Sequence, residues 1–212
     1  MSHAERRSLR VLLAALLVAF GLSACAPLLV GGAVITGMSA SDRRTTGSQI
    51  EDERIETRGA ARIREHLGER VHINITSYNR QVLLTGEVPN EQDRQLAEQV
   101  VSRVENVRAI VNELAVLGPS TLSQRSSDTL VTGRVKSNLI DAKDLNSNAF
   151  KVVTERGVAY LMGRVTAREA DRATDLARRT NGVQKVVRLL ELISEEELLE
   201  MLTPPGTSPA AK

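Results

Sequence analysis

The sequence has very few aromatic residues: two tyrosines, two phenylalanines and no tryptophan in 212 residues. Modules that hold single-stranded nucleic acid stack the bases on aromatic side chains, so this composition argues against a nucleic-acid partner. The chain also has a single cysteine, which excludes a disulfide within the chain and a metal site built from cysteines. Stability must therefore come from the packing of aliphatic side chains, and we expect no cofactor and no metal site.

The one cysteine, Cys25, ends a segment with the features of a secretory signal peptide. Three arginines within the first ten residues precede an apolar run at 11–22. This run has 12 residues, whereas a helix needs ~20 to cross a bilayer. Two small residues then lead to the cysteine, so LSAC at 22–25 resembles a bacterial lipobox.

The lipobox resemblance implies that residues 1–24 are a signal peptide and that the mature chain begins at an acylated (palmitate-bearing) Cys25. Each buried CH₂ of an acyl chain contributes ~0.8 kcal/mol, and a stable anchor needs more than one chain. Residues 25–49, rich in glycine and alanine, would then be a flexible tether. Ala26 follows the cysteine in place of the aspartate associated with inner-membrane retention, which agrees with the outer membrane.

An uncleaved transmembrane anchor is the alternative, because no charged residue occurs between Val11 and Ser41. The second half of that stretch contains one proline and three glycines. These residues weaken an isolated helix, although membranes tolerate them better than water does. We therefore favour the lipoprotein.

The rest of the chain contains two copies of one unit. Residues 82–114 align with residues 159–192, and the segment upstream of each copy aligns at a constant offset of 76. The matched pairs include Gly86 with Gly163, Val88 with Val165, Ile55 with Val131, and Asp52 with Asp128. A repeat of this length indicates one fold used twice.

Each copy has the pattern of helix, strand, strand, helix and strand. Apolar residues at helical spacing predict first helices at 52–67 and 128–140. Their inward stripes are Ile55, Ile63 and Leu67 in one copy, and Val131, Val135 and Leu139 in the other. β-branched runs at 71–76 and 150–154 predict the first strands, and QVLLTGEV and VAYLMGRV predict the second.

The second helices begin at recognisable caps. Asn90 caps one, and Thr166 with Glu169 forms a capping box for the other. The expected stripes of these helices are Leu96, Val100 and Val104, or Ala173, Leu176 and Ala177. Closing strands follow at 107–116 and 183–193. A right-handed crossover places both helices on one face of a three-stranded mixed sheet, which is an α+β fold. Each copy is small for a core of its own, so we expect the two to pack together.

The order α-β-β-α-β, with a glycine near the end of the second strand and Gly-Val opening the third, resembles the BON domain. With the lipobox and the tether, the chain resembles the dual BON-domain outer-membrane lipoproteins, the division- and outer-membrane-stress-associated lipid-binding family. We assign residues 50–118 and 128–194 to the two BON domains, 119–127 to a linker, and 195–212 to an acidic helix end and a disordered tail. The resemblance implies a non-enzymatic protein, anchored at the periplasmic face of the outer membrane, that binds anionic phospholipid through its second domain and supports membrane integrity.

Charge offers a check that is independent of the resemblance. Residues 50–117 have nine Arg/Lys and twelve Asp/Glu, a net of −3, whereas residues 128–193 have twelve and eight, a net of +4. Only the second copy suits an anionic surface. Within it, Leu130 should project outward from the first helix beside Arg134 and Lys136. These three are the candidate lipid-binding residues; packing of Leu130 against the other domain is the alternative.

Other patterns in the chain are weaker. His66 and His72 are the mature histidines, and we interpret both as solvated surface. No acid, base and nucleophile share a motif, so an enzyme is not expected. An adaptor is the second hypothesis: the acidic first domain would dock a protein of outer-membrane assembly or of the division site. Four glutamates at 195–200 indicate a solvated helix end whose leucines pack back.

Overall fold

The structure is a computed structural model that describes residues 42–202. The signal peptide, Cys25, most of the tether and the end of the tail lie outside the described residues. No helix among the described residues is long and apolar enough to span a bilayer.

The first domain has two helices and a mixed sheet. Its elements are α3 (Thr46–Leu67), η2 (Gly68–Arg70), β1 (His72–Tyr78), β2 (Gln81–Val88), α4 (Glu91–Ser102), β3 (Ala109–Asn112) and β4 (Ala115–Val116). β1 runs antiparallel to β2, and β3 and β4 both run parallel to β2. The expected closing strand is interrupted at Glu113–Leu114, where the Asn112 side chain accepts a hydrogen bond from the Leu114 amide at 3.2 Å. The sheet therefore has four strands instead of three.

The second domain repeats this order with a continuous closing strand. Its elements are α5 (Leu122–Asp141), η3 (Ser147–Ala149), β5 (Phe150–Glu155), β6 (Val158–Thr166), α6 (Ala167–Arg178) and β7 (Lys185–Ile193), followed by α7 (Glu195–Leu202). β5 is antiparallel and β7 parallel to β6, in the strand order β5-β6-β7. Both sheets are mixed and carry helices, so the expected α+β fold is confirmed.

Both first helices begin earlier than the apolar spacing predicts. α3 is capped by Thr45, and α5 by Thr121, which forms a capping box with Gln124. The first turns are polar and solvated, so they carry no apolar period that would mark them as helix. Residues 122–127, expected in the linker, are therefore the start of α5.

The cores lie between each helix pair and its own sheet. All six stripe residues expected on α3 and α5 are buried. On α4 the structure buries Ala97 and Val101 beside Val100, while Leu96 is only partly buried. On α6, Ala173 and Ala177 are buried as expected.

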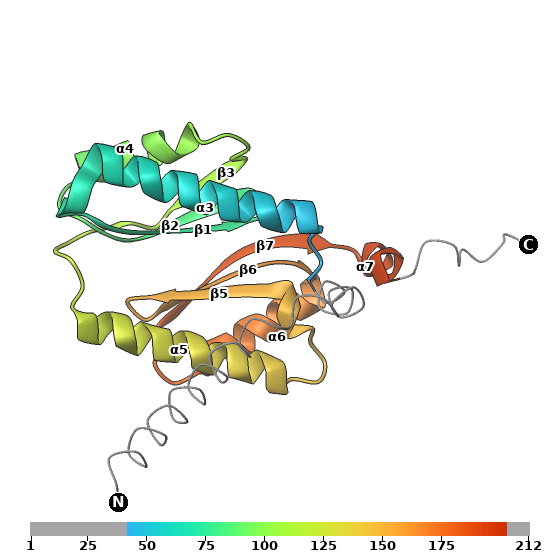
Figure 1. Cartoon of the computed structure of the whole chain (residues 1–212). Coiled ribbons are helices and arrows are strands. Elements are labelled where there is room, and N and C mark those ends of the chain that lie inside the picture. The colour runs from blue at the N-terminus through green and yellow to red at the C-terminus, as the bar shows by residue number, and fades with distance from the viewer. Residues whose placement is uncertain (1–41, 203–212) are drawn as a thin grey trace, which may run out of the picture. The chain divides into compact units, whose positions relative to one another are not determined.

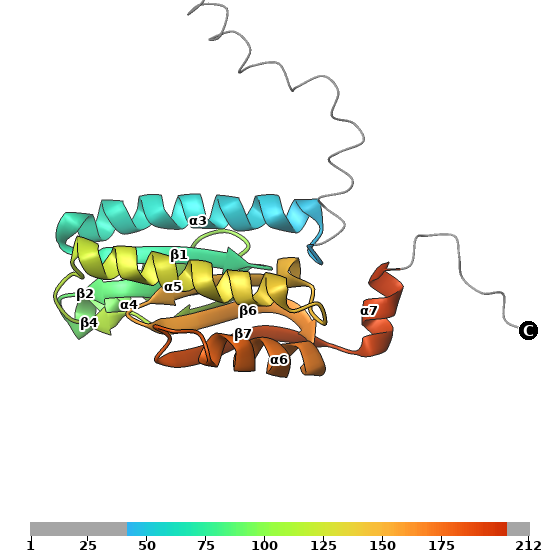
Figure 2. The same cartoon turned by 90° about the horizontal axis from the view of Figure 1, so that it is seen from below.

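The two sheets pack against each other through the faces that their helices leave bare. Tyr78, Leu83, Tyr160 and Met162 form the buried centre of this contact. The domains therefore stack as helices, sheet, sheet and helices, with α5 and α6 on the far side from α3 and α4 (Figure 1). Figure 2, seen from the side of the second domain, has α5 across the front. The expectation that the copies pack together is confirmed.

The glycine shared by both second strands has a steric reason. A Cβ at Gly86 would lie 2.0 Å from the carbonyl oxygen of His72, and a Cβ at Gly163 would lie 2.4 Å from that of Ala149. In each domain, the backbone that opens the neighbouring strand occupies the place where a side chain would be. Both copies therefore have glycine, which lacks a side chain, at this position.

Candidate functional site

The candidate lipid-binding residues lie on the solvent side of α5. Leu130 exposes 61% of its surface, and Arg134 and Lys136 are also exposed. The opposite side of the helix is buried against the sheet through Val131 and Val135. Leu130 therefore does not pack on the first domain. Its role in lipid binding stays a prediction.

Two further apolar residues share this side of α5, and the sequence analysis missed them. Leu122 is 79% exposed and Ile140 is 67% exposed. They are 18 residues apart, which at 3.6 residues per turn is about five full turns, so they point in nearly the same direction. Leu130 lies about 80° around the helix from both. We call Leu122, Leu130 and Ile140 the outer apolar face of α5.

The two candidate cations, Arg134 and Lys136, are not neutralised by acidic side chains. Neither Arg134 nor Lys136 forms an ion pair with any carboxylate of residues 42–202. Arg134 donates a hydrogen bond of 3.4 Å from Nη1 to the carbonyl oxygen of Asn181. Neither charge is therefore offset by a partner carboxylate, and both are screened by water and salt.

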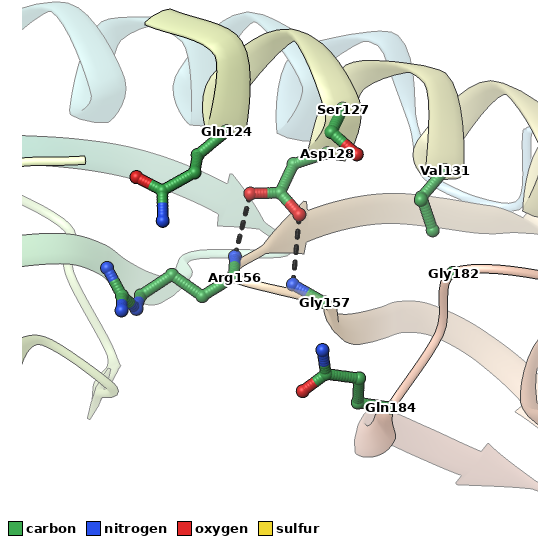
Figure 3. Close-up of a pocket in the computed structure, with 8 residues that line it drawn as sticks. All are labelled: Gln124, Ser127, Asp128, Val131, Arg156, Gly157, Gly182 and Gln184. Atoms are coloured by element: carbon green, nitrogen blue, oxygen red, sulfur yellow. Dashed lines mark hydrogen bonds between the residues drawn. The ribbon is translucent and has the colours of Figure 1, made fainter. Parts of the chain in front are cut away.

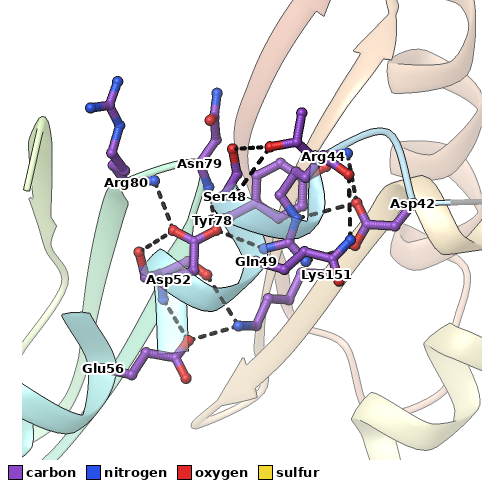
Figure 4. A network of polar contacts seen from close by, with 12 residues as sticks. Asp42, Arg44, Ser48, Gln49, Asp52, Glu56, Tyr78, Asn79, Arg80 and Lys151 are labelled. Atoms are coloured by element: carbon purple, nitrogen blue, oxygen red, sulfur yellow. Dashed lines mark hydrogen bonds and ion pairs between the residues drawn. The ribbon is translucent and has the colours of Figure 1, made fainter. Parts of the chain in front are cut away.

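The segment before α3 ties the two domains together. The Arg43 guanidinium donates two hydrogen bonds of 2.7 Å to the Glu169 carboxylate at the start of α6. Arg44 lies over the Tyr78 ring, 4.2 Å from its centre, and donates from Nη1 to the Asp52 carboxylate at 2.7 Å (Figure 4). Such charge-assisted contacts are stronger than neutral hydrogen bonds.

The tyrosine in this network belongs to the contact between the sheets. The Tyr78 hydroxyl accepts a hydrogen bond from the Arg164 amide at 3.2 Å and contacts the Ala149 carbonyl oxygen at 3.5 Å. Burial, reinforced by the charge of Asp42, raises the pKa of Tyr78 to about 12. The hydroxyl is therefore neutral at physiological pH and joins the domains as a hydrogen-bonding group.

His72 corrects one expectation of the sequence analysis. The polar face of β1 turns toward the second domain, because the sheets stack there, so the His72 side chain is only 20% exposed although Asn74 stays exposed. His72 Nδ1 lies 2.9 Å from Glu87 Oε2, while Asn74 donates to Glu155 of the second domain at 2.9 Å. His66, in contrast, is exposed as expected.

This interdomain cluster is the group of described residues that could hold a metal ion. One ligand atom each from His72, Glu87 and Glu155 lies within 4.8 Å of the others. However, Glu87 already accepts hydrogen bonds of 3.1 Å from the amide and hydroxyl of Ser120, and the Arg156 guanidinium is 3.3 Å away. These donors favour an ion-pair network that links the domains.

Replacing Glu155 with glutamine is expected to stabilise the protein at neutral pH. Burial, and then the charges of Glu87 and Asp128, raise the pKa of Glu155 above its ordinary value of 4.5. A raised folded pKa means that ionisation costs stability; the cost is absent below the ordinary pKa and is complete above the folded one. Glutamine keeps an acceptor for Asn74 without the charge. The midpoint temperature of thermal unfolding at pH 7 should rise by up to a few degrees. This gain should vanish near about pH 4.

Glu87→Gln is the matched control and should act in the opposite direction. Burial alone would raise the pKa of Glu87, but hydrogen bonds from His72, Ser120 and Arg156 hold it below its ordinary value. Its ionised form therefore adds stability above the ordinary pKa, and that stability is lost as the pH falls through the lowered value. Equal unfolding temperatures for the two variants at pH 7 would contradict this description of the cluster.

The protein is a tandem α+β module in which two helix–sheet domains are joined by their sheets and present their helices to solvent. One of these outer helices, α5, carries exposed cationic and apolar side chains. Residues 52–118 and 127–194 each match the model of the BON domain. The chain belongs to the BON-domain family.

Relatives that match this chain include an outer membrane lipoprotein, a hemolysin and an osmotically-inducible protein. The outer membrane lipoprotein DolP of Haemophilus influenzae is 32% identical over 195 residues, covering 91% of this chain and all of that protein. The 21 kDa hemolysin of Actinobacillus pleuropneumoniae is 32% identical over 72% of this chain and 79% of its own length. The osmotically-inducible protein Y of Escherichia coli is 27% identical over 69% of this chain and 75% of its own length.

Proposed function

We propose that this protein is a non-enzymatic, lipid-anchored protein of the periplasmic face of the outer membrane, which binds anionic phospholipid through α5 of its second BON domain. The likeness to an outer membrane lipoprotein along 91% of the chain supports the location. In this proposal, contact with the phospholipid headgroups supports the integrity of the membrane.

The observation that carries the proposal is the outer apolar face of α5 beside unpaired cations. Leu122, Leu130 and Ile140 point away from the core and are exposed. An apolar strip flanked by basic residues suits a helix that lies in the headgroup region, with its apolar side chains inserted a short way. Each cation near an anionic surface contributes about 1 kcal/mol, and each leucine or isoleucine at most about 1.5–3 kcal/mol when it leaves water completely.

Reversing the two cations is expected to abolish binding to anionic vesicles. The double variant Arg134→Glu with Lys136→Glu changes the local charge by four units and replaces attraction with repulsion. Co-sedimentation of the unacylated chain with phosphatidylglycerol vesicles should fall at least about tenfold, and raising salt should weaken the wild type similarly. Leu130→Glu and Ile140→Glu should each weaken binding even at low salt, because they also remove insertion.

The first domain offers the control for this experiment. Arg54 occupies the position that matches Leu130 and is exposed on α3. Arg54→Glu should leave co-sedimentation unchanged, because α3 lies on the opposite side of the stacked sheets. If Arg54→Glu destroys binding while the α5 variants keep it, the site on α5 is wrong and the adaptor function is the better account.

A further inference from the structure

The two copies use one carboxylate in the same way. Asp52 and Asp128 each lie seven residues after the threonine that caps the first helix of their domain. Asp52 accepts hydrogen bonds of 2.8 Å from the amides of Asn79 and Arg80, in the turn between β1 and β2. Asp128 likewise accepts from the amides of Arg156 and Gly157, at 2.8 and 2.9 Å (Figure 3). The carboxylate therefore holds the hairpin turn against the helix in both domains.

The two copies differ in what else the carboxylate binds. Asp52 also accepts 2.7 Å hydrogen bonds from the Ser77 hydroxyl and from the guanidinium of Arg44, the residue just before the helix cap. Figure 4 shows this arginine reaching Asp52 beside the Tyr78 ring. The first-domain carboxylate is thus fully surrounded, and its charge is neutralised by a cation from the short bent segment before α3.

In the second domain neither of these two partners is present. The residue just before the cap is Ser120, which donates to Glu87 and not to Asp128. Thr154 stands at the place of Ser77, but its hydroxyl has no hydrogen-bond partner among residues 42–202. Asp128 is only 8% exposed, yet within the described part of the chain it forms no ion pair and accepts from two amides alone. A carboxylate has room for about four donors, so half of its capacity is unused.

The unused side of Asp128 faces a pocket. The cavity has a volume of about 390 Å³, and α5 lines one wall of it through Gln124, Ser127 and Val131. Gln184 from the loop before β7 closes the opposite wall (Figure 3). The amide oxygen of Gln184 can accept hydrogen bonds from a ligand that enters the pocket, whereas that of Gln124 already accepts from the Thr121 amide and hydroxyl at 2.8 and 3.1 Å.

The charge around the pocket favours a cation. Besides Asp128, two more carboxylates lie close by, those of Glu87 and Glu155, and they act on one another strongly enough to help raise the pKa of Glu155. The Arg156 guanidinium turns to Glu87 at 3.3 Å, and Arg134 at the Gly182 side donates to the Asn181 carbonyl. Three buried or nearly buried carboxylates therefore share one arginine and one histidine, which leaves negative charge unbalanced.

We propose that this pocket binds the guanidinium of an arginine carried on a partner polypeptide, as Arg44 binds Asp52 in the first domain. A planar guanidinium can donate to the free lone pairs of Asp128 and to the amide oxygen of Gln184 together. The site lies beside α5 but does not use its outer apolar face, so it does not depend on the proposed lipid binding.

The test uses a fluorescein-labelled peptide that copies residues 42–46 and the full chain, purified in detergent. Fluorescence anisotropy should show saturable binding of the peptide. The same peptide with citrulline in place of both Arg43 and Arg44 keeps the planar shape, but it loses the charge and exchanges one donor group for an acceptor oxygen, so its affinity should fall at least about tenfold.

Protein variants locate the binding within the molecule. Asp128→Asn should lower the affinity at least about tenfold, but it also weakens the hold on the hairpin turn. Gln184→Lys and Gln184→Glu leave that turn intact. The lysine should compete for Asp128 and reduce peptide affinity about tenfold, whereas the glutamate should increase it several-fold. Circular dichroism checks that each variant is folded.

Several results would overturn the proposal. Absence of saturable binding, or equal binding of the arginine and citrulline peptides, would exclude a guanidinium site. Equal affinities for folded Gln184→Lys and Gln184→Glu would place any binding elsewhere. If phosphatidylethanolamine vesicles, but not the peptide, protect Gly157 and Gly182 from amide hydrogen exchange, the pocket takes a lipid ammonium group and not an arginine.

Discussion

Replacing Val135 with aspartate is expected to unfold the second domain at neutral pH. Val135 is completely buried in the core between α5 and its sheet, beside Leu139 and Val131. An unpaired carboxylate there must either stay charged in an apolar environment or take up a proton, and either course costs several kcal/mol, about 3–5 or more. Since a domain is stable by only about 5–15 kcal/mol, most of its stability would be lost.

Thermal unfolding followed by circular dichroism measures this effect. Leu130→Asp, five residues earlier on the same helix, adds the same charge at an exposed position. Its midpoint should stay close to that of the wild type, within about 0.5 kcal/mol of stability. Equal midpoints for Val135→Asp and the wild type would mean that the buried face of α5 is wrongly assigned.

Replacing Cys25 with serine is expected to remove the protein from the outer-membrane fraction. A serine hydroxyl cannot be acylated by the lipobox pathway, so the proposed anchor would be lost. The remaining affinity would come from α5 alone, at about 1 kcal/mol per cation near the surface. Labelling with a palmitate analogue and membrane fractionation measure the loss, which should be nearly complete.

Ala26→Asp is the matched control for the anchor. It leaves Cys25 intact, so the label should be retained, while the protein should move to the inner-membrane fraction as the lipobox resemblance implies. Equal labelling of the wild type and Cys25→Ser would show that the chain is not acylated at this residue. An uncleaved transmembrane segment would then be the better account of residues 11–41.

Much of the fold could be predicted because its determinants are local. The spacing of Val131, Val135 and Leu139 fixes which side of α5 meets the sheet, and the Thr166–Glu169 box fixes where α6 begins. The repeat also strengthens the prediction, since a weak sequence pattern in one copy recurs in the other. The early starts of α3 and α5 could not be predicted, because a largely polar, solvated first turn has no apolar periodicity.

The contacts around the site could not be predicted in the same way. Alternation along β1 correctly places His72 on a polar face, but alternation does not say what covers that face. The sheet of the second domain covers this face. It brings Glu155, which is 83 residues away from His72 in the sequence, into the same cluster. Leu122 belongs to the outer apolar face only because α5 begins at this residue, whereas Ile140 already lies within the helix predicted at 128–140.

Because the two sheets stack, the difference in net charge between the copies becomes a separation of charge across the molecule. The first copy has a net charge of −3 and the second +4, a difference of seven, and the two domains lie on opposite sides of the contact between their sheets. The molecule is therefore an electric dipole across its layers. In the field of an anionic bilayer such a dipole experiences a torque, which turns α5 toward the membrane before any side chain makes contact. The duplication thus supplies a means of orientation that neither domain would have alone.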